Sequence, residues 1–189
     1  EARHLSEVLQ RVRAVPVEKE IICVDDCSSD DTWAILQEES QRPGTYVFRH
    51  SQNMGKGAAV RTGLGQVSGD VVIIQDADLE YEPNDYIKLL EPIQRGDCQV
   101  VYGSRFLGRP EAMSLSSALG NRFVTTVANA LFRTRLTDLE TCYKVFTADI
   151  ARRLQLVSPR WGFDPEITAK IVRMGYTIRS ERRSAWTSR

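Results

Sequence analysis

Residues 71–81 read VVIIQDADLEY, a run of apolar residues followed by acidic ones. Four β-branched apolar residues predict a buried strand over residues 70–75, which runs directly into the carboxylates of Asp76, Asp78 and Glu80. Residues i and i+2 of an extended chain lie on the same face, so Asp76 and Asp78 can bind one hard cation together. Mg²⁺ or Mn²⁺ carrying a diphosphate fits this set, because such ions prefer oxygen ligands and share them with substrate phosphates.

The Asp-x-Asp pair is by itself a weak motif with a plain structural alternative. Asp78 or Asn84 could simply cap the helix expected at residues 84–95. Only motifs elsewhere in the chain can separate the two alternatives.

Strands and helices alternate along the rest of the sequence. The apolar spacing of Leu5, Val8, Leu9 and Val12 predicts a first helix that ends before Pro16. Further strands are expected at residues 21–24, 46–49, 70–75, 98–102 and 176–180, and further helices at residues 31–40, 55–67, 84–95, 115–132, 148–156 and 165–174. This alternation predicts an α/β fold with a mostly parallel sheet.

Polar residues follow three of the expected strands, and sites in such folds gather at the carboxyl ends of strands. The three segments are Asp25-Asp26, Asp76-Ala77-Asp78 and Gly103-Ser104-Arg105.

The 189-residue length fits one domain, and 25 basic residues balance 25 acidic ones. Residues 70–97 hold eight acidic residues against Lys88 and Arg95, whereas residues 104–135 hold five arginines against Glu111 alone. An acidic patch followed by a basic patch fits a site for a metal and anionic groups, although two solvated faces would look the same. We expect no nucleic-acid partner.

The cysteines Cys23, Cys27, Cys98 and Cys142 have no CxxC spacing and no histidine cluster beside them, so a zinc site is not expected. A reducing compartment is the default setting for such thiols. Because no signal peptide and no apolar run of 18 residues is visible, we expect a cytoplasmic chain that does not span a membrane.

Seven segments in a fixed order resemble the family 2 glycosyltransferases, most closely those that act on dolichyl or polyprenyl phosphates. They are IICVDDCSSDDT (21–32), NMGKGAAVRTG (53–63), DVVIIQDADLEY (70–81), VVYGSRF (100–106), GNRF (120–123), DLETCYKVF (138–146) and WGFDPEITAKI (161–171). The resemblance implies a nucleotide-diphospho-sugar transferase (GT-A-like) fold, and it favours the metal-site alternative for Asp76, Asp78 and Glu80.

The resemblance also implies roles for residues outside the acidic segment. Asp25 and Asp26 would bind the nucleotide, and Asn53 and Lys56 would lie at a glycine-bearing turn suited to an anion. In the same family, basic and hydroxyl groups surround the acceptor phosphate, and the matching residues here are Arg105, Arg122, Thr141 and Lys144.

The implied reaction moves a hexose from a GDP-mannose or UDP-glucose type donor to a polyprenyl phosphate, with Mg²⁺ or Mn²⁺ and inversion. A phosphate monoester is mostly dianionic at neutral pH, so this acceptor needs no general base. A sugar hydroxyl acceptor would need one, and Asp138 or Glu140 would then serve. A catalytically silent nucleotide-binding remnant is a third alternative.

The family normally begins with a strand of the type VVIPxYNE, which lies in the middle of the sheet, whereas this chain starts at Glu1. We therefore expect a single catalytic domain over residues 1–189 that is truncated at both ends and lacks its first central strand. A lipid acceptor would place it at the cytoplasmic face of a membrane. The apolar stripe of Leu115, Leu119, Phe123, Val127 and Leu131 would lie beside the lipid, although a plain core helix has the same pattern.

Overall fold

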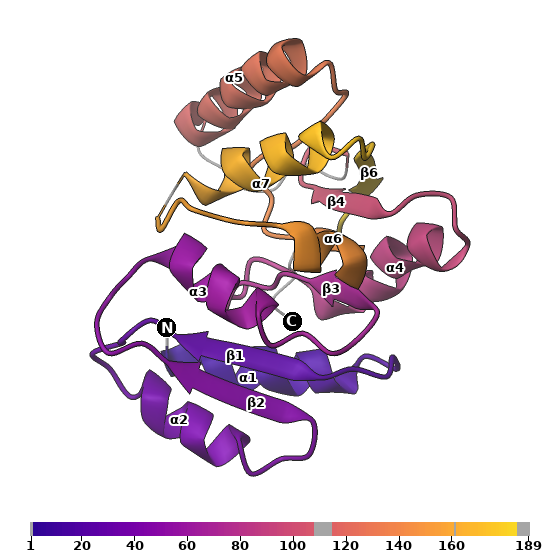
Figure 1. The fold of residues 1–189 in the computed structure, drawn as a ribbon. Helices are drawn as coiled ribbons and strands as arrows, with labels where there is room; N and C mark the ends of the chain where they lie inside the picture. The colour runs from indigo at the N-terminus through magenta and orange to yellow at the C-terminus, as the bar shows by residue number, and fades with distance from the viewer. Residues whose placement is uncertain (1, 108–114, 161, 185–189) are drawn as a thin grey trace.

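A computed structural model describes residues 2–107, 115–160 and 162–184 of the chain. The elements, in chain order, are α1 (Ala2–Ala14), β1 (Ile21–Asp25), α2 (Thr32–Glu39), β2 (Thr45–Arg49), α3 (Lys56–Leu64), β3 (Val71–Ile73), the 3-10 helix η1 (Pro83–Asp85), α4 (Tyr86–Gln94), β4 (Val100–Ser104), α5 (Leu115–Phe132), β5 (Lys144–Thr147), α6 (Ala148–Arg153), α7 (Phe163–Arg173) and β6 (Arg179–Arg182). The expected α/β class is confirmed (Figure 1). Within the described residues, no helix has both the length and the apolar composition needed to cross a membrane.

The strands form two separate sheets. β1 and β2 pair in parallel, and the second sheet has the order β3-β5-β4-β6. In that sheet β4 and β6 are parallel, while β5 is antiparallel to both of its neighbours, so β3, β4 and β6 share one direction. β5 was not expected from the sequence, although its Val145 and Phe146 are fully buried.

The division between the sheets falls between β1 and β3. Within the described residues, each of these two strands pairs with a neighbouring strand on one side only. Figure 1 shows β1 and β2 packed with α1 and α2, and the four-stranded sheet lying apart from them. Within the described residues, therefore, no strand joins the two sheets.

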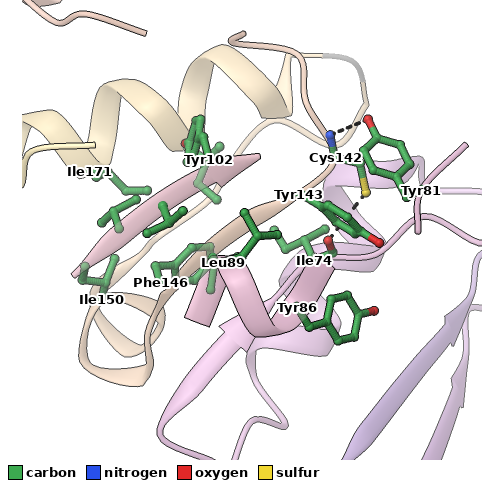
Figure 2. Packing of buried hydrophobic residues seen from close by; sticks show 14 of the residues in the cluster. Ile74, Tyr81, Tyr86, Leu89, Tyr102, Cys142, Tyr143, Phe146, Ile150 and Ile171 are labelled. Carbon is green, nitrogen blue, oxygen red and sulfur yellow. Dashed lines mark hydrogen bonds between the residues drawn. The ribbon is translucent and has the colours of Figure 1, made fainter. Parts of the chain in front are cut away.

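Helix α1 joins the two parts of the hydrophobic core. Its apolar residues are buried with the predicted spacing, Val8 and Val12 in the main cluster and Leu5 and Leu9 in a smaller cluster with Leu36. The main cluster lies on the four-stranded sheet, where Leu89, Tyr102, Tyr143 and Phe146 are fully buried (Figure 2). Each large apolar side chain buried here contributes about 1.5–3 kcal/mol to folding.

Candidate functional site

The Asp-x-Asp pair lies in a loop, because β3 ends at Ile73. Pairing with β5 continues for one more residue, as the Ile74 amide donates to the Lys144 carbonyl at 3.1 Å. The chain then leaves the sheet, and the Asp76 amide donates to Sγ of Cys142 at 2.9 Å. The expectation that Asp76 and Asp78 share one face of a strand is therefore wrong. We call residues 76–80 the acidic loop.

The carboxylate of Asp76 forms an ion pair with a lysine. It lies 2.8 Å from Nζ of Lys56, the first residue of α3. Burial alone would lower the pKa of Lys56, but the charge and hydrogen bond of Asp76 and the charges of Cys142 and Asp164 together outweigh burial and raise it. The structure thus brings together Lys56 and Asp76, two residues expected at the donor site.

Asp78 is half-buried and forms no ion pair within the described residues. Burial raises the pKa of its carboxyl group, and the charges of Asp76 and Glu80 add to this effect. A carboxylate flanked by two others is a place where a cation is favoured. Among the described residues, however, no three His, Cys, Asp or Glu side chains converge tightly enough to form a metal cage.

The donor set nevertheless fits a cation that is held partly by substrate. Mg²⁺ is commonly bound by one or two carboxylates together with substrate phosphates and water, so Asp78 with Glu80 supplies the right chemistry. The helix-cap alternative does not account for Asp78. The cap of η1 is Glu82, which accepts from the Asn84 amide, whereas within the described residues Asp78 accepts only from the Glu80 amide of its own loop.

Tyr81, a residue that the sequence did not single out, anchors the end of this loop. Tyr81 is buried, and its hydroxyl accepts a hydrogen bond from the Cys142 amide at 2.9 Å (Figure 2). Its ring meets that of Tyr143 edge-on at 4.7 Å between centroids. Burial is the main cause that raises the pKa of Tyr81 above its ordinary value, so the neutral phenol is an anchor for the loop.

Asp25 and Asp26 lie where β1 ends, and both side chains have structural partners. Asp25 is buried, accepts from the Ser28 amide, and lies 3.0 Å from Nε of Arg49. Asp26 accepts from His50 and from the amides of Met54 and Gly55. Burial alone would raise the pKa of Asp26, but these hydrogen bonds lower it.

The glycine-bearing turn at the start of α3 is not an open anion site. Two of its amides donate to Asp26, and the Ala58 amide donates to the carbonyl of Pro159 at 3.1 Å. A Cβ at Gly57 would lie 2.1 Å from the Ser158 carbonyl, so glycine permits close approach of this loop. The side chain of Asn53 is exposed and donates to the Asp26 carbonyl at 3.4 Å.

Arg105 follows β4 and is held by a buried carboxylate. Its Nε and Nη2 donate to Asp138 at 2.7 and 2.8 Å, and Asn121 of α5 donates to the same carboxylate at 2.9 Å. Burial would raise the pKa of Asp138, but the hydrogen bonds and charge of Arg105 lower it. The charge of Arg105 also acts against the rise in the pKa of Tyr81, the residue that follows the acidic loop.

Lys144 and Thr141 lie inside the protein, away from any surface site. Lys144 is fully buried and is hydrogen-bonded to Asp164 and to the Thr141 carbonyl. The Thr141 hydroxyl is also fully buried and donates to the Gly103 carbonyl. Direct contact of either side chain with an acceptor phosphate is therefore not compatible with this arrangement. Both residues instead hold β4, β5 and α7 together.

Helix α5 exposes its apolar stripe. The side chains of Leu119, Phe123 and Leu131 are 68%, 71% and 71% exposed, with Val127 between them also exposed. Arg122 is exposed on the same helix. The side chain of Leu115 lies outside the part of the chain that the structure describes. The core-helix alternative is therefore wrong for this stripe.

The two sheets with their covering helices, and charged residues at the ends of β1 and β4 and in the loop after β3, match the nucleotide-diphospho-sugar transferase fold. The chain belongs to the family described as Glycosyl transferase family 2, whose sequence profile matches residues 1–154.

Among curated proteins, the chain is similar to mannosyltransferases that are named for dolichol phosphate and for undecaprenyl phosphate. Over 109 residues it is 36% identical to the dolichol-phosphate mannosyltransferase of Pyrococcus furiosus, which covers 57% of this chain and 31% of that protein. Over 190 aligned residues it is 27% identical to the undecaprenyl-phosphate mannosyltransferase of Micrococcus luteus, which covers 94% of this chain and 76% of that protein. The chain thus spans less than a third of the first relative's length.

Solved structures share the fold at low sequence identity. Glucosyl-3-phosphoglycerate synthase from Mycobacterium tuberculosis superposes with a TM-score of 0.74 at 19% identity, over 99% of this chain and 68% of that one. The mannosyltransferase PcManGT from Pyrobaculum calidifontis, in complex with GDP-Man and Mn²⁺, gives 0.70 at 20% identity, over 96% and 52%.

Proposed function

We propose that this chain carries out inverting, metal-dependent transfer of a hexose from a nucleotide-diphospho-sugar to a polyprenyl or dolichyl phosphate. The observation that carries the proposal is Asp78, a half-buried carboxylate beside Asp76 and Glu80 that forms no ion pair in the described structure. A divalent cation at Asp78 and Glu80 would neutralise this charge and act as a Lewis acid toward the leaving diphosphate. Asp76, held by Lys56, would orient the loop.

The proposed step is a single displacement. An oxygen of the acceptor phosphate forms a bond to the anomeric carbon while the bond from that carbon to the diphosphate oxygen breaks, and the bonding pair leaves with the nucleoside diphosphate. Attack opposite the leaving group inverts the anomeric centre. The protein's task is alignment and charge stabilisation. Arg105 is suited to this task, because Asp138 fixes the orientation of its guanidinium.

A phosphate acceptor is favoured over a sugar hydroxyl by the state of Asp138. A hydroxyl acceptor needs a general base, and a base must reach the substrate with an oxygen able to take a proton. Asp138 is buried, bonded to Arg105 and Asn121, and has a lowered pKa, so it is a poor base. Of the two bases considered, only Glu140 is exposed.

The exposed stripe of α5 supports a lipid acceptor. Leu119, Phe123 and Leu131 offer apolar surface to an isoprenoid tail or to the acyl region of a membrane, with Arg122 on the same helix able to pair with phosphate. The two curated relatives are named for dolichol phosphate and undecaprenyl phosphate. We therefore propose peripheral contact with the cytoplasmic face of a membrane. Either Mg²⁺ or Mn²⁺ would suit the carboxylate oxygens of Asp78 and Glu80.

The test begins with thermal shifts for GDP and UDP, each with and without Mn²⁺, on the wild-type chain and Asp78→Ala. Metal-dependent stabilisation that Asp78→Ala loses supports the donor site, and unchanged stabilisation in that variant overturns it. Transfer from the better nucleotide's sugar to detergent-solubilised polyprenyl phosphate then tests the acceptor. Transfer only to a sugar hydroxyl would favour the second alternative, and tight binding without turnover would favour the silent remnant.

A further inference from the structure

Arg183, the residue after β6, contacts the last residue of the acidic loop and the tyrosine that follows it. Arg183 is only 2% exposed, and its Nη1 donates to the Glu80 carbonyl at 2.8 Å. Its guanidinium carbon lies 4.4 Å from the centroid of the Tyr81 ring, a cation–π distance. The Arg183 amide donates to the Ser104 carbonyl at 3.4 Å, next to Arg105.

The next residue holds the far end of the segment that follows the acidic loop. The amide and the hydroxyl of Ser184 both donate to the carboxylate of Asp85, which is buried just before α4. Lys88 reaches the same carboxylate at 3.1 Å and Ser184 Oγ at 3.2 Å. Residues 80–85 are thus fixed at both ends by two consecutive residues of the chain, Arg183 and Ser184, which we call the clasp.

A loop that carries three carboxylates needs such support. Residues 74–82 have no helix or strand, and the charges of Asp76 and Glu80 disfavour the ionised form of Asp78 in the absence of a cation. The guanidinium of Arg183 supplies the loop with positive charge and directional hydrogen-bond donors, and it offers a flat face to the Tyr81 ring. An ammonium supplies only the charge.

We propose that the clasp is a positioning device, in which Arg183 holds the acidic loop in the conformation that lets Asp78 bind a divalent cation. This inference rests on the proposed function, because it assigns the same loop to the metal. Arg183 also connects the acidic loop with β4, because its side chain binds the Glu80 carbonyl and its amide binds the Ser104 carbonyl beside Arg105.

The test compares Arg183→Lys with Arg182→Lys, a matched change at the exposed neighbouring residue. Amide hydrogen exchange of residues 76–85 in the metal-free full chain reports the loop itself. The Mn²⁺ concentration that half-saturates nucleoside-diphosphate binding reports the site. Arg183→Lys should speed exchange in the loop and raise the Mn²⁺ requirement by about tenfold or more, as expected for one lost charge-assisted hydrogen bond. Arg182→Lys should change neither.

Ser184→Ala tests the clasp by a milder change and should speed exchange at residues 82–85 without unfolding the chain. Unchanged loop exchange in both clasp variants would overturn the proposal. Faster exchange with an unaltered Mn²⁺ requirement would also overturn it, because Arg183 would then be structural only. Failure of the proposed function looks different: wild-type protein would show no Mn²⁺-dependent nucleotide binding at all.

Discussion

Lys56 and Asp76 form an ion pair of 2.8 Å that ties the start of α3 to the loop after β3. Asp78 lies two residues further on in the same loop. Its carboxylate is half-buried and forms no ion pair in the described structure. The division of roles is physical. A carboxylate neutralised by lysine orients the backbone, whereas an unneutralised one between two acidic neighbours attracts a cation.

Asp78→Asn should stabilise the metal-free protein at pH 7 and abolish its stabilisation by Mn²⁺ with nucleotide. Burial and the neighbouring carboxylates raise the pKa of Asp78 in the folded state, so its ionised form opposes folding once the pH exceeds that pKa. The gain in melting temperature should therefore be present at pH 7 and vanish below the unfolded pKa of about 4.

Thermal melts in EDTA and in Mn²⁺ at both pH values make this measurement. Asp70→Asn, at an exposed aspartate beside β3, is the control and should behave as wild type. An Asp78→Asn protein that is less stable than wild type in EDTA at pH 7 would contradict the electrostatic argument.

Arg105→Ala should destabilise the protein by about 3–5 kcal/mol, because it leaves the Asp138 carboxylate buried with only Asn121 as a side-chain partner. In wild type the lowered pKa of Asp138 contributes stability that is present above its unfolded pKa and is lost as the pH falls. Without Arg105, burial reverses the shift, so the deficit of the variant should shrink on acidification. Urea unfolding at pH 7 and pH 4.5 measures both effects.

The double variant Arg105→Leu/Asp138→Leu provides the control for this pair. It removes both charges, so it should recover much of the stability that Arg105→Ala loses while remaining inactive. If the double variant is as unstable as the single one, the loss comes from packing and the buried-charge explanation does not hold.

The periodic helices and the apolar strands β1, β2 and β4 were predictable from the sequence, whereas the four-residue β5 and partners distant along the chain were not. The spacing of Leu5 to Val12 predicted α1, and the expected helix at residues 115–132 matches α5. β5 has only four residues, too few for a periodic pattern. β3 is shorter than expected, because the chain turns away to bond with Cys142.

The internal contacts of the candidate site could not be foreseen from the sequence. Pairs such as Lys56–Asp76, Arg105–Asp138 and Lys144–Asp164 join residues 20, 33 and 20 positions apart, and a single sequence holds no local signal for them. The residue types predicted a charged site. Only the fold shows which charges neutralise one another, and why Lys144 is a core residue.

A strand inserted between β1 and β3 should stabilise the protein. Each of these strands has an unpaired side within the described residues, and buried backbone groups without partners are costly. We expect a VVIPxYN-type segment fused upstream of residue 1 to raise the melting temperature by more than about 5 °C and to slow amide exchange in both strands. A fusion with the same residues scrambled around two prolines is the control. Equal melting temperatures for the two fusions would count against an incomplete sheet.

The exposed stripe of α5 should determine use of the lipid acceptor. Phe123 and Leu131 are each 71% exposed, so changing both to serine costs no core packing. Loss of two large apolar contacts, each worth about 1.5–3 kcal/mol when fully buried, should weaken binding to vesicles containing polyprenyl phosphate by at least about tenfold. Arg122→Ala should raise the KM for the acceptor and leave donor affinity unchanged.

Val157→Ser is the matched control for the stripe, because Val157 is 72% exposed but lies in the loop between α6 and α7. It should bind vesicles as wild type does. The measurements are vesicle co-sedimentation and steady-state kinetics with both substrates varied. If the α5 variants bind vesicles normally, the lipid-acceptor proposal loses its main support. If Arg122→Ala lowers donor affinity while the acceptor dependence stays the same, Arg122 belongs to the nucleotide site.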